Sequence, residues 1–144
     1  MRIVVIDGQG GRLGRRLLAG IREACPNAKL FAIGTNSLAT HMMMGAGCAD
    51  HLATGENAVI VACRTADLIV GPFGITVADA MLGEISPAMA NAVAASRAYR
   101  ILIPMNLCDT YIAGVSRNSS SILEDAFSHI LQFVKKAHPE AVRQ

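Results

Sequence analysis

The chain has 144 residues, of which 52% are hydrophobic and 17% charged, and its net charge is +2 at pH 7. This length suits a single domain, residues 1–144, and is too short for a cofactor domain with a separate substrate domain. The near-neutral charge and the lack of tryptophan, with two tyrosines and four phenylalanines, argue against nucleic-acid binding. The small charged fraction indicates that part of the surface is buried in a homo-oligomer, most simply a homodimer.

Neither a membrane segment nor a metal site is expected. No hydrophobic run reaches the roughly 18 residues that a membrane span needs. The four cysteines, Cys25, Cys48, Cys63 and Cys108, form no C-x-x-C pair, and the first strand pattern begins at the start of the chain, which favours a reduced, cytoplasmic protein. Cys48 and His51 have ligand-like spacing, but no second close pair completes a tetrahedral site, so we expect no bound metal.

Short β-branched runs alternate with helical patterns along the chain. Strands are expected at residues 3–7, 29–34, 49–54, 67–72 and 100–106, and residues 110–115 are a candidate for an extra edge strand. Helices are expected after the first glycines, with Leu13, Leu17 and Ile21 on one face, and at residues 36–47, 56–66, 74–83, from 87 onward and at 121–136. Residues 56–66 also contain β-branched side chains that favour a strand. Their position between two predicted strands favours a helix, which is the structure that we predict.

Capping residues mark the starts of three of these helices. Asn36 is a suitable N-cap, and Ser86 precedes a proline, Pro87, at the first helical position. Ser121 and Glu124 have the spacing of a capping box. These residues therefore support the helix starts given above.

The alternation predicts an α/β fold, a Rossmann-like three-layer αβα sandwich around a parallel sheet. Right-handed connections with the first strand in the centre give the strand order 3-2-1-4-5. Ligands bind such sheets outside the carboxyl ends of the strands, where the winding reverses between the first and fourth strands. Binding residues should therefore lie in the segments that directly follow the strands.

The segment after the first strand is rich in glycine, because residues 8–14 read GQGGRLG. Such glycines allow a tight turn, a close approach of backbone to a phosphate and close packing of the helix on the strand, and the N–H groups of the helix start would face the anion. The spacing G-x-G-G-x-x-G is one residue longer than the common dinucleotide-binding pattern, so a purely structural turn is the alternative. The predicted site for a nucleotide or other phosphate-bearing small molecule consists of Gly8, Gln9, Gly10, Gly11, Arg12, Leu13, Gly14, Thr35 and Asn36.

The end of the second strand bears on the cofactor. Residues 34–37 read GTNS and lack the Asp or Glu that usually holds the ribose of NAD, which favours NADP, and Arg12 could supply charge for the 2′-phosphate. FMN or another nucleotide is less favoured, because the glycine segment carries no hydroxyl side chain. Arg15 and Arg16 stand where a P-loop ATPase needs a lysine and a hydroxyl, which argues against that class.

Three carboxylates, those of Glu56, Asp79 and Glu84, could act as general bases, but none has a histidine or a nucleophile beside it in the sequence. We therefore assign no catalytic residue and leave the question of an enzyme open. Three functions are compatible with the sequence: an enzyme that uses NADP or flavin, a non-catalytic sensor, and a scaffold subunit whose glycine turn is structural.

Five motifs together resemble an uncharacterised bacterial family, a domain of unknown function with a Rossmann-like fold. They are VIDGQGGRLG, IGTNSLAT, ATGENA, GPFGITVADAMLGEISP and ILIPMN. The resemblance covers roughly residues 2–116 and implies the fold without implying an activity. Arg12 and Arg15 stand where the resemblance leads us to expect Gly and Lys.

Overall fold

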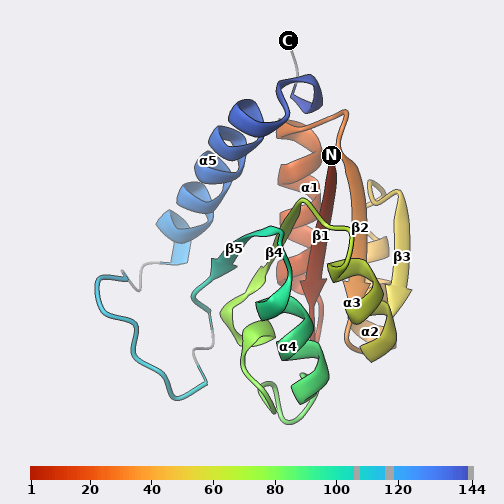
Figure 1. Cartoon of the computed structure of the whole chain (residues 1–144), viewed down its shortest axis with the longest axis vertical. Coiled ribbons are helices and arrows are strands. Elements are labelled where there is room, and N and C mark those ends of the chain that lie inside the picture. The colour runs from red at the N-terminus through yellow and green to blue at the C-terminus, as the bar shows by residue number, and fades with distance from the viewer. Residues whose placement is uncertain (106–107, 116–118, 143–144) are drawn as a thin grey trace.

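The computed structural model describes residues 1–105, 108–115 and 119–142, with the backbone alone for 119 and 120 (Figure 1). The strands are β1 (Arg2–Asp7), β2 (Lys29–Gly34), β3 (His51–Thr54), β4 (Leu68–Pro72) and β5 (Tyr99–Ile103). The α-helices are α1 (Arg12–Ala24), α2 (Ser37–Met44), α3 (Glu56–Cys63), α4 (Pro87–Ala95) and α5 (Ser119–Ala137). Two short 3₁₀ helices, η1 (Phe73–Thr76) and η2 (Pro139–Ala141), complete the regular structure.

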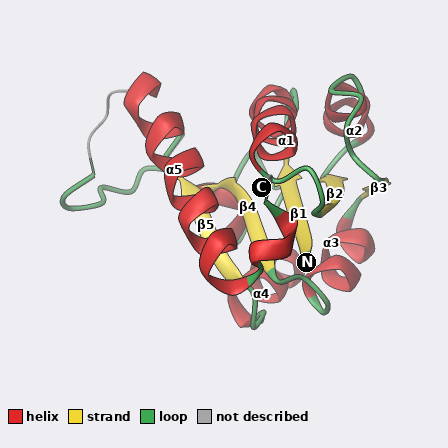
Figure 2. Ribbon diagram, turned by 90° about the horizontal axis from the view of Figure 1, so that it is seen from above, coloured by secondary structure: helices red, strands yellow, loops and turns green. Residues whose placement is uncertain are grey.

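The strands form one five-stranded sheet in the order β3-β2-β1-β4-β5, and each neighbouring pair is parallel. In the middle of the sheet, Ile3 of β1 lies opposite Leu30 of β2 and Leu68 of β4. Helices cover both faces (Figure 2). This arrangement confirms the predicted three-layer fold and the predicted strand order, and it explains why β1 is a continuous hydrophobic run.

Alternate residues of β1 face two separate hydrophobic clusters. Ile3 and Val5 belong to the cluster formed with α1 and α5, whereas Val4 and Ile6 belong to the cluster formed with α3 and α4. Figure 2 shows α1 and α5 on one side of the sheet and α3 and α4 on the other. The two-residue period of a strand therefore divides the core between the two faces.

The long helices bury the faces that their periodicity predicts. Leu17 and Ile21 of α1 are fully buried, and Leu13 packs at the margin of the same cluster. The buried residues of α5 are Leu123, Ala126, Ile130 and Val134. Because α5 begins at Ser119, the capping-box spacing from Ser121 lies inside the helix and does not mark its N-cap. Among the described residues, none of the helices combines the length and hydrophobicity that a membrane crossing requires.

The other predicted helix starts agree with the structure. The Asn36 side chain accepts a hydrogen bond from the Ala39 N–H at 2.8 Å, and the Ser86 hydroxyl accepts one from the Met89 N–H at 3.2 Å. The ambiguous segment 56–66 is helical over residues 56–63, as its place in the alternation predicted, and the helix ends three residues earlier than expected. The helix predicted at 36–47 likewise ends earlier, at Met44. Local capping chemistry and alternation were therefore sufficient for the helix starts but not for the ends.

The helix predicted at residues 74–83 is wrong. After the short η1, the chain runs through a series of turns in which Asp79, Met81 and Leu82 have φ values of 62°, 57° and 58°. Such left-handed residues cannot continue a right-handed helix. Ala80 and Ile85, which are buried against the α3 and α4 cluster, fix these turns, so tertiary packing overrides the local preference for a helix.

The candidate edge strand at residues 110–115 is absent from this structure. These residues form no strand and lie outside the sheet beyond β5 (Figure 1). Cys108 and Asp109 have φ values of 48° and 56°, and Gly114 has a φ of 81°. Left-handed backbone on both sides of the β-branched run interrupts the extended conformation that strand pairing requires.

Candidate functional site

The glycine-rich loop connects β1 to α1 at the carboxyl edge of the sheet. The Gly11 N–H donates to the Gly8 carbonyl oxygen at 3.0 Å, which closes a tight turn. Gly11 then serves as the N-cap of α1 with a φ of 70°. The predicted strand–loop–helix order is therefore present, and the loop ends in the first turn of a 13-residue helix.

Asp7, the last residue of β1, is buried beneath this loop. Its Oδ1 accepts a hydrogen bond from the Gly8 N–H at 2.9 Å, and its Oδ2 accepts one from the Gly14 N–H at 2.7 Å. Burial raises the pKa of Asp7, the two backbone hydrogen bonds oppose that rise, and the nearby charge of Glu84 adds to it. A carboxylate of the chain itself therefore caps the first turn of α1.

Glu84 reaches the same loop from the segment between β4 and α4. Its Oε2 accepts hydrogen bonds from the Gln9 N–H at 2.7 Å, the Thr35 hydroxyl at 2.6 Å and the Asn36 side-chain amide at 2.9 Å. Desolvation alone would raise the pKa of Glu84, but these three hydrogen bonds lower it overall. The carboxylate thus joins the ends of β1 and β2 to a segment that follows β4.

The glycines of the loop have different structural roles. A Cβ on Gly11 would lie 2.5 Å from the Ala39 carbonyl oxygen, and one on Gly14 would collide with Met43 of α2. A Cβ on Gly10 would meet nothing within 4 Å. Close packing of α1 against α2 therefore explains Gly11 and Gly14, whereas Gly10 borders open space.

Three backbone donors of the loop have no partner among the described residues, namely the N–H groups of Gly10, Arg12 and Leu13. They lie at the start of α1, where the helix dipole favours negative charge. The Arg12 and Arg15 side chains are exposed beside them. This part of the loop can therefore bind an anion.

The structure brings the predicted site residues to one edge of the sheet. The Asn36 side-chain amide donates to the Gln9 carbonyl oxygen at 3.1 Å, and the Thr35 N–H donates to the Asp7 carbonyl oxygen at 3.0 Å. Sequence reasoning did not assign Asp7 or Glu84 to this site. The sequence offered a signal for Asp7, because it is an acidic residue at the end of a buried strand. It offered none for Glu84, because Glu84 is 75 residues away along the chain from its partner Gln9.

The end of β2 does carry a carboxylate, contrary to the premise of the NADP prediction. Glu84 supplies it through hydrogen bonds to Thr35 and Asn36, although no acidic residue stands there in the sequence. The premise failed because it considered residues of the strand end itself and not those that the fold brings to it.

The other candidate carboxylates lie apart from the glycine-rich loop or make separate contacts. Glu56 is exposed and accepts a hydrogen bond from the Ser86 hydroxyl, and Asp79 is also exposed. The ring of His51 packs against that of Phe31, with 4.6 Å between the ring centroids. Within the part of the chain that the structure describes, no three His, Cys, Asp or Glu side chains gather where they could hold a metal ion.

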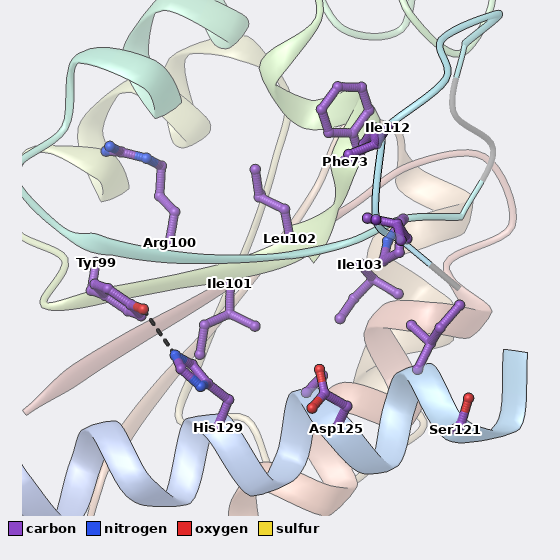
Figure 3. A pocket seen from close by; sticks show the side chains of 15 residues that line it. Phe73, Tyr99, Arg100, Ile101, Leu102, Ile103, Ile112, Ser121, Asp125 and His129 are labelled. Carbon is purple, nitrogen blue, oxygen red and sulfur yellow. Dashed lines mark hydrogen bonds between the residues drawn. The ribbon is translucent and has the colours of Figure 1, made fainter. Parts of the chain in front are cut away.

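A cavity of about 690 Å³ lies elsewhere, along β5 and α5 (Figure 3). Hydrophobic residues such as Ile101 and Ile103 line it, and Asp125 and His129 project into it from α5. The Tyr99 hydroxyl and His129 Nε2 are hydrogen-bonded at 2.9 Å. None of the predicted site residues lines this cavity, so it is distinct from the glycine-rich loop.

Comparison with known families identifies the chain. Residues 2–138 match the family described as "Domain of unknown function (DUF3842)". The chain belongs to this family. The match confirms the resemblance that the motifs indicated and extends it into α5.

Comparisons with individual proteins add one solved structure. No curated protein matches the chain. A dodecameric FMN-dependent UbiX-like decarboxylase from Escherichia coli O157:H7 is 19% identical in sequence, with 100% of this chain and 99% of that chain covered and a TM-score of 0.47.

Proposed function

We propose that the glycine-rich loop, residues 8–14, binds the phosphate group of a nucleotide or another phosphate-bearing small molecule. The observation that carries this proposal is the set of free N–H groups on Gly10, Arg12 and Leu13 beside the open space at Gly10. Backbone donors at a helix start bind phosphate through hydrogen bonds and the helix dipole. The site is thus proposed as a binding site, with no catalytic residue assigned.

The identity of the ligand is a separate question. NADP, NAD, FMN, AMP and inorganic phosphate all carry the group that the loop is proposed to bind. The sequence argument that ranked NADP first depended on a strand end without a carboxylate, and Glu84 supplies one. We therefore propose the phosphate group as the common recognition element and leave NADP as one member of the set.

A thermal-shift panel of these compounds tests the proposal. A ligand at about a hundred times its dissociation constant stabilises the folded state by about 2.7 kcal/mol, which corresponds to a rise in melting temperature of roughly 5–10 °C. Gly10→Val should abolish this rise by filling the open space, yet keep the melting temperature of the free protein, because a Cβ there meets nothing within 4 Å. Arg12→Ala should weaken the rise without abolishing it.

A scaffold or sensor subunit with a structural glycine turn is the alternative function. It is favoured by the hydrogen bonds of Asp7 and Glu84, which already satisfy the N–H groups of Gly8, Gln9 and Gly14. If no phosphate compound raises the melting temperature, or if Gly10→Val responds as the parent does, the loop is structural. A sensor would instead bind the compound and change its assembly without turnover.

We further propose that the chain self-associates as a homodimer. β5 is the last strand of the sheet, and its residues line the open cavity. Tyr99 of this strand is 43% exposed. Exposed edge strands with apolar neighbours readily pair with a second copy. Light scattering after size exclusion should give twice the chain mass of 15.1 kDa, and the mass of a single chain would contradict the proposal.

A further inference from the structure

One carboxylate oxygen of Glu84 collects three hydrogen bonds from two separate segments of the chain. The donors are the Gln9 N–H of the glycine-rich loop and, at the end of β2, the Thr35 hydroxyl and the Asn36 side-chain amide. All three distances are 2.9 Å or shorter, which is typical of charge-assisted hydrogen bonds to an anion. The donors therefore form a complete binding site for one anionic oxygen.

The segment that carries Glu84 is held closed by few contacts. The Asp79 N–H donates to the Ile85 carbonyl oxygen at 2.8 Å, and the Ile85 N–H donates to the Ala80 carbonyl oxygen at 3.2 Å, so the base of this turn is pinned. Residues 81–84 form its tip. Leu82 is 99% exposed, so the side-chain contacts of the tip come from Met81 and Glu84. Two backbone hydrogen bonds add to them: the Gly83 N–H donates to the Asp79 carbonyl oxygen at 3.1 Å, and the Glu84 N–H donates to the Met81 carbonyl oxygen at 3.2 Å.

The backbone of the tip opposes the closed position. Met81 and Leu82 adopt φ values of 57° and 58°, a left-handed conformation that costs free energy for residues with a side chain. The hydrogen bonds of Glu84 offset this cost in the closed state. Release of Glu84 would allow both residues to return to ordinary backbone angles, while Ala80 and Ile85 stay buried.

A phosphate on the loop and a carboxylate on the same loop repel each other. Glu84 accepts a hydrogen bond from the Gln9 N–H, and the next residue along the chain, Gly10, has a free N–H. A phosphate there and the Glu84 carboxylate would be like charges in close proximity, and none of the ion pairs among the described residues involves Glu84. We propose that Gln9, Thr35 and Asn36 form an anion subsite, which Glu84 occupies in the free protein and which a phosphate-bearing ligand takes by displacing it. This inference rests on the proposed function.

Affinity measurements on charge variants test the displacement. Isothermal titration of inorganic phosphate and of AMP would compare the wild type with Glu84→Gln and Glu84→Ala. Because the competing charge is gone, both variants should bind inorganic phosphate and AMP at least tenfold more tightly than the wild type. Glu124→Gln, on an exposed position of α5, removes the same charge and should leave both affinities unchanged.

The outcomes separate this inference from the proposed function. If the wild type binds phosphate and both Glu84 variants bind it equally or more weakly, the displacement is overturned and the proposed function stands. Weaker binding of AMP with unchanged binding of inorganic phosphate would overturn it too, by showing that Glu84 holds a ribose hydroxyl. If no variant binds either compound, both the inference and the proposed function fail.

A second measurement needs no variant. Hydrogen exchange of the wild type, followed by mass spectrometry, reports on the turn through the Gly83 N–H, which donates to the Asp79 carbonyl oxygen at 3.1 Å. Saturating inorganic phosphate should speed exchange in residues 77–86 if Glu84 is released, while residues 12–24 of α1 should exchange more slowly or at the same rate. Slower or unchanged exchange in residues 77–86 would overturn the displacement.

Discussion

Two loops meet at the carboxyl edge of the sheet, and they obtain left-handed backbone in different ways. The loop after β1 has two left-handed residues: Gln9 at a φ of 49°, and a glycine, Gly11, at 70°, where the missing side chain also allows the backbone to approach Ala39. The loop after β4 places Asp79, Met81 and Leu82 at positive φ, beside a single glycine, Gly83, at 86°. The first loop thus holds one non-glycine residue in left-handed backbone and the second loop holds three, so the second loop carries more strain that its hydrogen bonds must offset.

The largest effect is expected at Gly11. Gly11→Val would force a β-branched residue into left-handed backbone and drive its Cβ to within 2.5 Å of the Ala39 carbonyl oxygen. The unfolding free energy should fall by about 3 kcal/mol or more, as measured by urea denaturation. Gly10→Val is the matched control, and its unfolding free energy should stay close to that of the wild type. Equal losses in the two variants would remove the distinction between packed and open glycines in this loop.

A smaller loss of unfolding free energy is expected from a change at Glu84, whose side chain links the two loops. Removing the charge in Glu84→Gln weakens three hydrogen bonds to a partly exposed carboxylate, so the unfolding free energy at pH 7 should fall by about 1 kcal/mol. Because the pKa of Glu84 is lowered in the folded state, its stabilisation is fully present above the ordinary value of 4.5 and is lost as the pH falls below it.

Urea denaturation of both proteins at pH 7 and at about pH 3.5 measures this pH dependence. The difference between them should shrink at the lower pH. The pKa of Asp7 is raised mainly by burial, so its own contribution declines as the pH rises, and burial is common to both proteins. The charge of Glu84, the smallest cause of the rise, is absent from the variant, so the Asp7 contribution does not cancel completely. A difference that grows on acidification would mean that Glu84 is not stabilised as an anion.

The smallest effect concerns backbone strain in the second loop. Leu82→Gly would remove an exposed side chain from left-handed backbone, so the unfolding free energy should rise by about 0.5 kcal/mol.

Gly83→Ala tests the opposite change, because a Cβ at this position meets nothing within 4 Å and adds backbone strain alone. It should lower the unfolding free energy by about 1 kcal/mol. If both variants are neutral in thermal denaturation, the left-handed backbone at residues 82 and 83 carries no strain.

The same comparison explains how far the sequence could predict the structure. The N-caps Asn36 and Ser86 and the buried face of α1 depend on residues close together in the chain, and all were predicted correctly. The strand order pairs distant residues, and it was predicted correctly because the alternation of strands and helices and the handedness of their connections determine it. In the first loop, glycine itself is the local signal. Periodicity and capping therefore recover the parts of the molecule that local preferences decide.

The second loop and its carboxylate depend on distant packing. The buried side chains of Ala80 and Ile85 fix turns in a segment whose local preference is helical. The Glu84 carboxylate accepts a hydrogen bond from Asn36, which is 48 residues away along the chain. Nothing near Thr35 in the sequence signals that an acidic side chain will arrive there. The sequence thus predicted that the glycine-rich segment and residues 35 and 36 lie at the same edge of the sheet, but it did not predict the carboxylates that meet them there.

The anchoring of the second loop has a consequence for how related chains can diverge. Ala80 and Ile85 hold its base in the hydrophobic core, whereas residues 81–84 contribute Leu82 and Gly83 to the surface and Glu84 to the site. A change at the tip therefore alters which chemical group faces the glycine-rich loop without disturbing the sheet or its helices. The hydrophobic anchors and the group that contacts the glycine-rich loop are thus different residues of one short segment, so position 84 can change while the anchors of the turn stay the same.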